Sequence, residues 1–89
     1  MAEWTGDYAR KWTRLTLAHY GTICHLCGQD GATTADHRIP RSQGGSDTLG
    51  NLRPAHKHCN IVRRTQPLSQ WFAKHPLPTR PTAAPSREW

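Results

Sequence analysis

The pattern of apolar and polar positions predicts an amphipathic helix near the start of the chain. Between residues 4 and 20, aromatic and apolar side chains recur at spacings of three and four residues, and most basic side chains lie off that line. This spacing places them on one face of a helix, which we expect to end at Gly21. The residues of the predicted apolar face are Tyr8, Trp12, Leu15 and His19.

The centre of the chain has a different character. Glycines interrupt the sequence between residues 24 and 60, and short runs at 33–39 and 51–53 predict two short strands joined by a loop. The segment 57–64 contains no helix breaker and precedes Pro67, so we expect one short helix there.

The end of the chain is predicted to contain one more helix and a tail. Between residues 68 and 75, apolar residues that include Trp71 and Phe72 have a helical spacing, so we expect this segment to dock on the core. Prolines recur after residue 75, and Pro-rich segments favour extended chain. We therefore predict a single domain at residues 1–75 and an extended, poorly ordered tail at residues 76–89.

Length and composition limit what such a chain can be. With 89 residues, of which 35% are hydrophobic, it forms one domain with a thin apolar core. We therefore expect additional stabilisation, such as disulfides or a bound metal. Three cysteines cannot all pair as disulfides, no charged-then-apolar leader opens the chain, and no apolar run approaches the roughly 20 residues that cross a bilayer. We therefore expect a cytoplasmic protein, neither secreted nor membrane-bound.

The charge balance indicates a polyanionic partner. Twelve Lys and Arg residues stand against six Asp and Glu residues, which gives a formal net charge of +6, and nine of the twelve are arginines. The guanidinium fork of arginine matches the geometry of phosphate. Nucleic acid is therefore the first candidate among the partners.

Two pairs of residues have the spacing of a zinc site. Cys24 and Cys27 form a CxxC pair, and after 28 intervening residues His56 and Cys59 form a second pair with the same two-residue gap. Zinc takes thiolate and imidazole ligands in fours, so the two pairs predict one structural zinc ion. His58 is an alternative fourth ligand, but we prefer His56, because adjacent residues rarely turn both side chains onto one ion. A redox-active dithiol is the alternative for the CxxC pair, but it requires a βαβ setting that this sequence lacks.

Between the two pairs lies a series of short motifs in a fixed order. They are DHRIPR from Asp36, then Gly44-Gly45, then Asn51-Leu52, and finally Cys59-Asn60. Together with the CxxC pair, this series resembles the HNH endonuclease family over residues 24–60. The resemblance implies an α+β fold of the ββα-metal type, in which a hairpin and a helix are stapled by the zinc ion, flanked here by an N-terminal and a C-terminal helix.

The resemblance also implies roles for four residues. His37 would be the general base that activates water, and an imidazole that is largely neutral at pH 7 suits that role. Asp36, directed the other way along the strand, and Asn60 would bind the catalytic divalent cation. Two oxygen donors favour Mg²⁺ or Mn²⁺ there. Asn51 would fix the hairpin loop and orient the base.

Basic residues gather around the predicted site. From Asp36 to Arg64 there are six basic and two acidic side chains, which favours contact with DNA phosphates over a merely solvated face. We expect Arg41 and either Arg63 or Arg64 to bind the backbone, with Arg38 as a further candidate. The helix predicted near the start of the chain we interpret as a cover over the core, not as a helix that contacts DNA.

The predicted function is that of a metal-dependent HNH endonuclease that hydrolyses DNA phosphodiester bonds. The flanking segments are similar to those of small phage HNH proteins, which implies phage DNA processing or packaging, terminase or packaging proteins as further partners, and the host cytoplasm as location. The alternative is a non-catalytic zinc-dependent nucleic-acid-binding module or a packaging adaptor. Asp36, His37 and Asn60 favour the nuclease, because binding alone has no use for a base beside two oxygen ligands.

Overall fold

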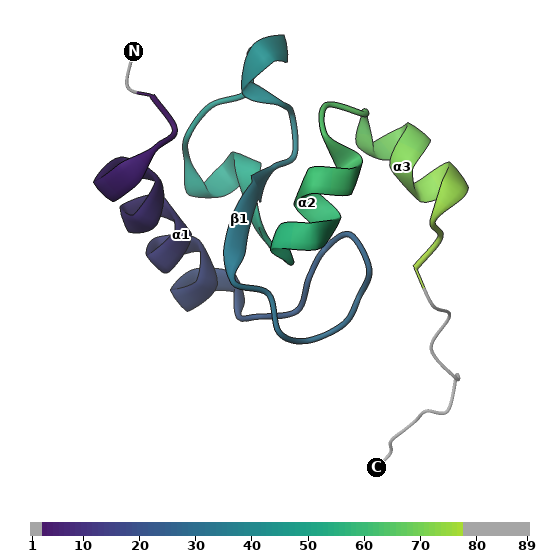
Figure 1. Cartoon of the computed structure of the whole chain (residues 1–89), viewed down its shortest axis with the longest axis horizontal. Coiled ribbons are helices and arrows are strands. Elements are labelled where there is room, and N and C mark those ends of the chain that lie inside the picture. Colours follow the sequence, from purple (N-terminus) through teal and green to yellow (C-terminus); the bar gives the residue numbers. More distant parts are fainter. Residues whose placement is uncertain (1–2, 78–89) are drawn as a thin grey trace.

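The computed structural model describes residues 3–77, which form a short hairpin surrounded by helices (Figure 1). In chain order, the elements are α1 (Gly6–Tyr20), β1 (Thr34–His37), the 3-10 turns η1 (Arg41–Gln43) and η2 (Leu49–Asn51), β2 (Leu52–Ala55), α2 (Lys57–Arg63) and α3 (Leu68–Lys74). The α+β class and the strand–strand–helix order predicted from the sequence are confirmed. The predicted tail at 76–89 lies, after Leu77, outside the described residues. No helix between residues 3 and 77 is long and apolar enough to span a bilayer.

The two strands pair antiparallel and bring the ends of a long loop together. Thr34 pairs with Ala55 at one end of the hairpin, and His37 pairs with Leu52 at the other. The connection from residue 38 to residue 51 contains both 3-10 turns. His37 therefore stands at the last paired position of β1, where loop side chains can reach it.

Helix α1 packs on the hairpin with a face rotated from the predicted one. Thr16 is fully buried, and its hydroxyl donates to the carbonyl oxygen of Trp12 at 2.7 Å. Leu15 is 38% exposed and His19 is exposed, so the predicted apolar line through these two residues was wrong. A threonine can enter a core when its hydroxyl is satisfied inside its own helix, which a count of apolar letters does not detect. The helix ends, as predicted, at Gly21, where φ is 88°.

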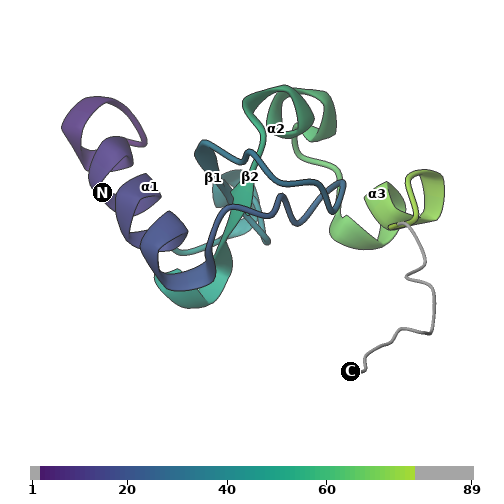
Figure 2. The ribbon, with the colours of Figure 1, turned by 90° about the horizontal axis from the view of Figure 1, so that it is seen from below.

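The core is small and lies between the hairpin, the first cysteine pair and α3. Cys24 and Leu26 are fully buried there. Trp71 of α3 is 4% exposed, and its indole N–H donates to the carbonyl oxygen of Leu26 at 2.9 Å. The predicted docking of the last helix is thus confirmed. Two perpendicular views show α1 and α3 at opposite ends of the molecule, with the hairpin and α2 between them (Figures 1 and 2).

Candidate active site and metal centre

Four side chains gather their ligand atoms beside the start of α2. The sulfur atoms of Cys24, Cys27 and Cys59 and a ring nitrogen of His56 all lie within 4.8 Å of one another. The first two cysteines share a tight turn, closed by a hydrogen bond of 2.8 Å from the N–H of Gly28 to the carbonyl oxygen of Cys24. His56 is the N-cap residue of α2, and Cys59 lies in its first turn. The predicted ligand pairs therefore meet in space.

The His56 ring is oriented to bind a metal through Nδ1. Its Nε2 lies 2.9 Å from the carbonyl oxygen of Asp30, which can only accept a hydrogen bond, so Nε2 carries the proton. Nδ1 lies 3.3 Å from Sγ of Cys27 and 3.8 Å from Sγ of Cys59. Histidines that ligate a metal through one ring nitrogen typically donate a hydrogen bond from the other ring nitrogen in this way. His58 is exposed and lies outside the cluster, so the preference for His56 holds.

Crowding and burial at the cluster shift the pKa values of two of its thiols in opposite directions. Burial and the neighbouring charge of Cys24 raise the pKa of the Cys59 thiol to about 12. For Cys24, desolvation is outweighed by hydrogen bonds from the backbone of His56 and Leu26, and its pKa is lowered. If all three thiols ionised together in so small a volume, they would need a compensating positive charge, which a bound metal would supply. Three cysteines and one histidine are a donor set of structural Zn²⁺.

A second site, a cavity of about 320 Å³, lies at the end of β1. It brings together side chains from β1, η1, α2 and the residue after α2. The predicted site residues that line it are Asp36, His37, Arg41, Asn60 and Arg64. The cavity also contains Trp4, from the segment that precedes α1.

The His37 ring is held by a carboxylate of the hairpin loop. Its Nε2 lies 2.8 Å from Oδ1 of Asp47, and the His37 side chain is only 10% exposed. Asp47 also accepts a hydrogen bond of 2.8 Å from the hydroxyl of Tyr8 and pairs with Arg41 at 3.0 Å. Burial alone would raise the pKa of Asp47, but the hydrogen bonds from His37 and Tyr8 and the charge of Arg41 lower it. An ionised Asp47 keeps the imidazole proton on Nε2 and leaves Nδ1 as an acceptor.

Two aromatic residues from the N-terminal part of the chain complete this arrangement. The Trp4 ring packs edge-on against the His37 ring, with centroids 4.5 Å apart, and lies 6.0 Å from the Tyr8 ring. Sequence reasoning missed Trp4, Tyr8 and Asp47 as site residues. Asp47 could have been found as the acidic residue in the predicted loop, whereas the two aromatics carry no such signal, because only the fold brings them to the site.

Asp36 is buried and interacts with two basic side chains through one oxygen. Its Oδ2 accepts a hydrogen bond from Arg63 at 2.5 Å and lies 2.8 Å from Nε2 of His25, to which the sequence assigned no role. Arg63 is fully buried and also donates to the carbonyl oxygens of His37, Arg38 and Gln66. This position contradicts the DNA phosphate contact expected for Arg63. Its guanidinium instead joins α2 to the end of β1.

The other arginines expected to bind DNA lie in two different places. Arg64 is exposed at the rim of the cavity, where a φ of 55° ends α2. Arg41 is partly buried beside Asp47 in the same cavity. Arg38 is exposed and lines a separate cavity of about 240 Å³. The structure therefore groups Arg41 and Arg64 with His37, but not Arg38.

The side chain of Asn51 fixes the loop that carries Asp47. Its Oδ1 accepts from the N–H of Ile39 at 3.0 Å, and its Nδ2 donates to the carbonyl oxygens of Ile39 at 3.1 Å and Ser46 at 2.9 Å. At Gly45, an added Cβ would stand 1.7 Å from the carbonyl oxygen of Ile39, so no side chain fits there. The loop thus depends on both motif residues, Asn51 and Gly45.

Comparison with known proteins adds one finding to this geometry. Residues 24–64 match the model of the HNH endonuclease family. This segment is an HNH domain. HNH domains are in general nucleases that bind nucleic acids. A search of curated proteins and a search of solved structures found no match to this chain. The HNH domain contains the four-residue metal cluster and the hairpin, and α1 and α3 lie outside the matched segment.

Proposed function

We propose that the protein is a metal-dependent endonuclease that hydrolyses DNA phosphodiester bonds, by nicking one strand or cutting both. One observation supports this above the others: His37, Asp36 and Asn60, all from the HNH domain, line a single cavity, and His37 is oriented there by Asp47. A module that only binds DNA needs no imidazole whose proton is fixed on one nitrogen.

The proposed reaction begins with water at Nδ1 of His37. The imidazole accepts a proton from the water molecule while the water oxygen forms a bond to phosphorus. The bond from phosphorus to the 3′ oxygen then breaks, and this oxygen keeps the electron pair and takes a proton from solvent water. The products are a 5′ phosphate and a 3′ hydroxyl. Asp47, hydrogen-bonded to Nε2, stabilises the imidazolium that forms.

Asp36 and Asn60 are the proposed ligands of a catalytic divalent cation. His25 and Arg63 both engage Oδ2 of Asp36, so the carboxylate is held in place, and Oδ1 is the oxygen that would bind the cation. A carboxylate and an amide oxygen form a small, hard donor set that suits Mg²⁺ or Mn²⁺ with several water ligands. Such a cation stabilises negative charge on the scissile phosphate and on the leaving oxygen.

Arg41 and Arg64 are the proposed contacts to the phosphates beside the scissile bond. Both line the cavity that contains His37. The net charge of +6 supports electrostatic attraction of the DNA backbone, which requires no reading of bases.

A plasmid assay tests the proposal directly. Supercoiled plasmid is incubated with the zinc-loaded protein and Mg²⁺ or Mn²⁺, and in parallel with EDTA. Nicked or linear products that appear only with the added cation are expected. Zinc content is measured in the EDTA sample, because loss of the structural metal would also abolish activity. A protein that keeps its zinc, binds DNA and leaves the plasmid intact would instead be a binding module or a packaging adaptor.

The variant His37→Ala tests the proposed base. Removal of a general base lowers rates by about 10² to 10⁴-fold, so this variant should cut DNA at least about a hundredfold more slowly than the wild type. Zinc content, thermal unfolding and DNA affinity should stay near those of the wild type. Wild-type cleavage by a folded, zinc-loaded His37→Ala variant would remove His37 from the mechanism.

A further inference from the structure

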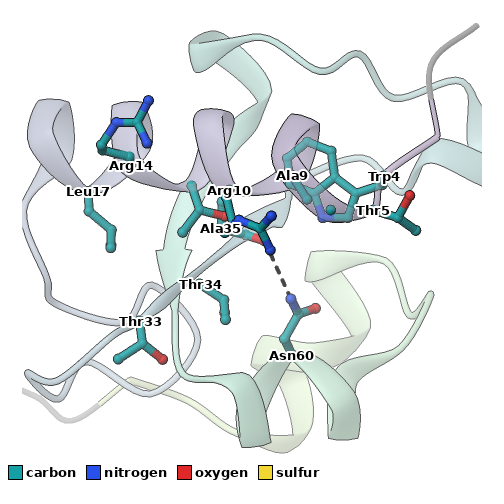
Figure 3. Close-up of a pocket in the computed structure, with 12 residues that line it drawn as sticks. Trp4, Thr5, Ala9, Arg10, Arg14, Leu17, Thr33, Thr34, Ala35 and Asn60 are labelled. Carbon is teal, nitrogen blue, oxygen red and sulfur yellow. Dashed lines mark hydrogen bonds between the residues drawn. The ribbon is translucent and has the colours of Figure 1, made fainter.

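A larger groove continues from the candidate catalytic cavity along the N-terminal helix. Its volume is about 830 Å³, and it shares Trp4, Ala35 and Asn60 with the cavity that contains His37. Figure 3 shows the side chains of α1 along one side and those of β1 and α2 along the other. The two hollows are therefore neighbours on one surface, with Trp4 and Asn60 at their boundary.

The two walls of the groove differ in chemistry. On the helix side, Arg10, Arg14 and Leu17 lie three or four residues apart and so share one face of α1. On the opposite side are Thr33 and Thr34, which lead directly into Asp36 and His37. The hydroxyl of Thr34 is bound to the carbonyl oxygen of Ala55, whereas Thr33 is exposed.

The charge of the groove suits a polyanion. Its described lining contains two arginines and no acidic side chain. Arg14 forms no hydrogen bond or ion pair with any residue from 3 to 77, and Arg10 pairs with Asp7 of the same helix at a largely exposed position. Exposed pairs of this kind are weak, so a phosphate can take the place of Asp7. Four residues of helix span about 6 Å along the axis, so the two arginines can meet neighbouring phosphates of one strand.

We propose that this groove binds the DNA strand on one side of the scissile phosphate, with Arg10 and Arg14 contacting its backbone. Helix α1 then has two roles: one face covers the hairpin, and the adjoining face extends the substrate site beyond the HNH domain. The proposal rests on the proposed nuclease function for its choice of DNA. It adds a binding segment that the matched residues 24–64 do not contain.

Binding measurements with single-charge variants test the proposal. The variants Arg10→Gln and Arg14→Gln each remove one charge at the groove, and Lys11→Gln removes one charge from the same helix outside the groove lining. Affinity for a duplex oligonucleotide is measured by fluorescence anisotropy over a range of salt concentrations. For each groove variant we expect an affinity about threefold to tenfold lower and a salt slope smaller in magnitude by about 0.9, the value for one phosphate contact. Lys11→Gln should leave the slope unchanged.

Cleavage kinetics give a second readout of position. At saturating DNA, the groove variants should keep the wild-type kcat and show a raised KM, because the contact is equal in ground and transition states. Shortening the substrate from one end should abolish the difference between Arg14→Gln and the wild type, and shortening it from the other end should not. Arg10→Lys should restore most of the affinity that Arg10→Gln loses.

The outcomes separate this proposal from the nuclease proposal. Equal effects of Arg14→Gln and Lys11→Gln on affinity and slope would overturn the groove, because only the overall charge would then matter, even if the protein cuts DNA. A reduced slope for the groove variants, together with an unchanged slope for Lys11→Gln, would support the groove even if no cleavage is seen. A reduced slope with RNA but not with DNA would overturn the choice of DNA.

Discussion

The metal cluster and the candidate catalytic cavity both use residues of the HNH domain, yet they are assembled in different ways. All four cluster ligands and the carbonyl of Asp30 that orients His56 lie within residues 24–64. In the cavity, His37 belongs to the matched segment, but the Trp4 ring against it and the Tyr8 hydroxyl on Asp47 come from outside. The cluster is therefore complete within the motif, whereas the cavity depends on the helix that precedes it.

This difference leads to different expectations for damage at the two sites. Loss of a metal ligand removes the metal cross-link on which a small core depends, so the stability of the whole fold should fall. Loss of a group that orients His37 should leave the fold intact and reduce the cleavage rate only in part. Single-residue variants at the two sites can therefore test this contrast.

The variant Cys59→Ala should lose zinc and cooperative unfolding together. Structural zinc binds peptides of similar size with about 10–16 kcal/mol at pH 7, which is as large as the whole stability of a typical domain, about 5–15 kcal/mol. Elemental analysis and thermal unfolding followed by circular dichroism measure the two effects. The matched control is His58→Ala, which changes the adjacent, exposed residue outside the cluster and should keep both zinc and stability. An unchanged unfolding midpoint for zinc-free Cys59→Ala would contradict a structural role for the metal.

The variant Arg63→Ala tests whether the buried arginine that joins α2 to the end of β1 stabilises the fold. It removes the guanidinium from three carbonyl oxygens and from the buried carboxylate of Asp36, which keeps only its contact with His25. Breaking a buried charge pair costs about 3–5 kcal/mol, and urea unfolding should show a loss of this size. Arg64→Ala removes the neighbouring, exposed arginine and should change the unfolding free energy by less than about 1 kcal/mol. Similar losses in the two variants would mean that Arg63 is not the tie between α2 and β1.

The variant Asp47→Asn tests the orientation of His37 without removing it. Asn keeps the shape of the side chain but loses the charge that holds the proton on Nε2, so we expect cleavage to slow by at least about tenfold. Nitrogen NMR of the His37 ring should show a proton on Nε2 in the wild type and a mixture of ring tautomers in the variant. An unaltered tautomer with wild-type activity would show that Asp47 only stabilises the loop.

The motif residues show how far the sequence alone could go. Metal ligands and the Asp36-His37 pair belong to a few residue types at fixed spacings, so their grouping could be predicted from their order in the chain. The buried position of Arg63 could not be predicted. The sequence does not distinguish a buried arginine with four hydrogen-bond acceptors from an exposed arginine that binds phosphate. The buried face of α1 was predicted wrongly for a related reason. Thr16 has a polar side chain, but it is fully buried because its hydroxyl bonds to the backbone of its own helix. The contact of Trp4 with His37 has no local signal at all.

The smallest expected effect belongs to Tyr8→Phe, which tests the dependence of the cavity on α1 most directly. Its hydroxyl donates to Asp47, and this hydrogen bond to a carboxylate raises the pKa of Tyr8, so the bond is intact throughout the neutral range. The variant removes one donor from Asp47 but keeps the carboxylate, its pair with Arg41 and its bond to His37. Cleavage should therefore slow by less than about tenfold, less than in Asp47→Asn, with zinc content unchanged. The matched control is Tyr20→Phe, which removes a hydroxyl bound to Leu49 from the other end of the same helix and should leave the cleavage rate unaltered. If Tyr8→Phe and Tyr20→Phe behave alike, α1 supports the hairpin without tuning His37, and the cavity would be as complete within the HNH domain as the metal cluster is.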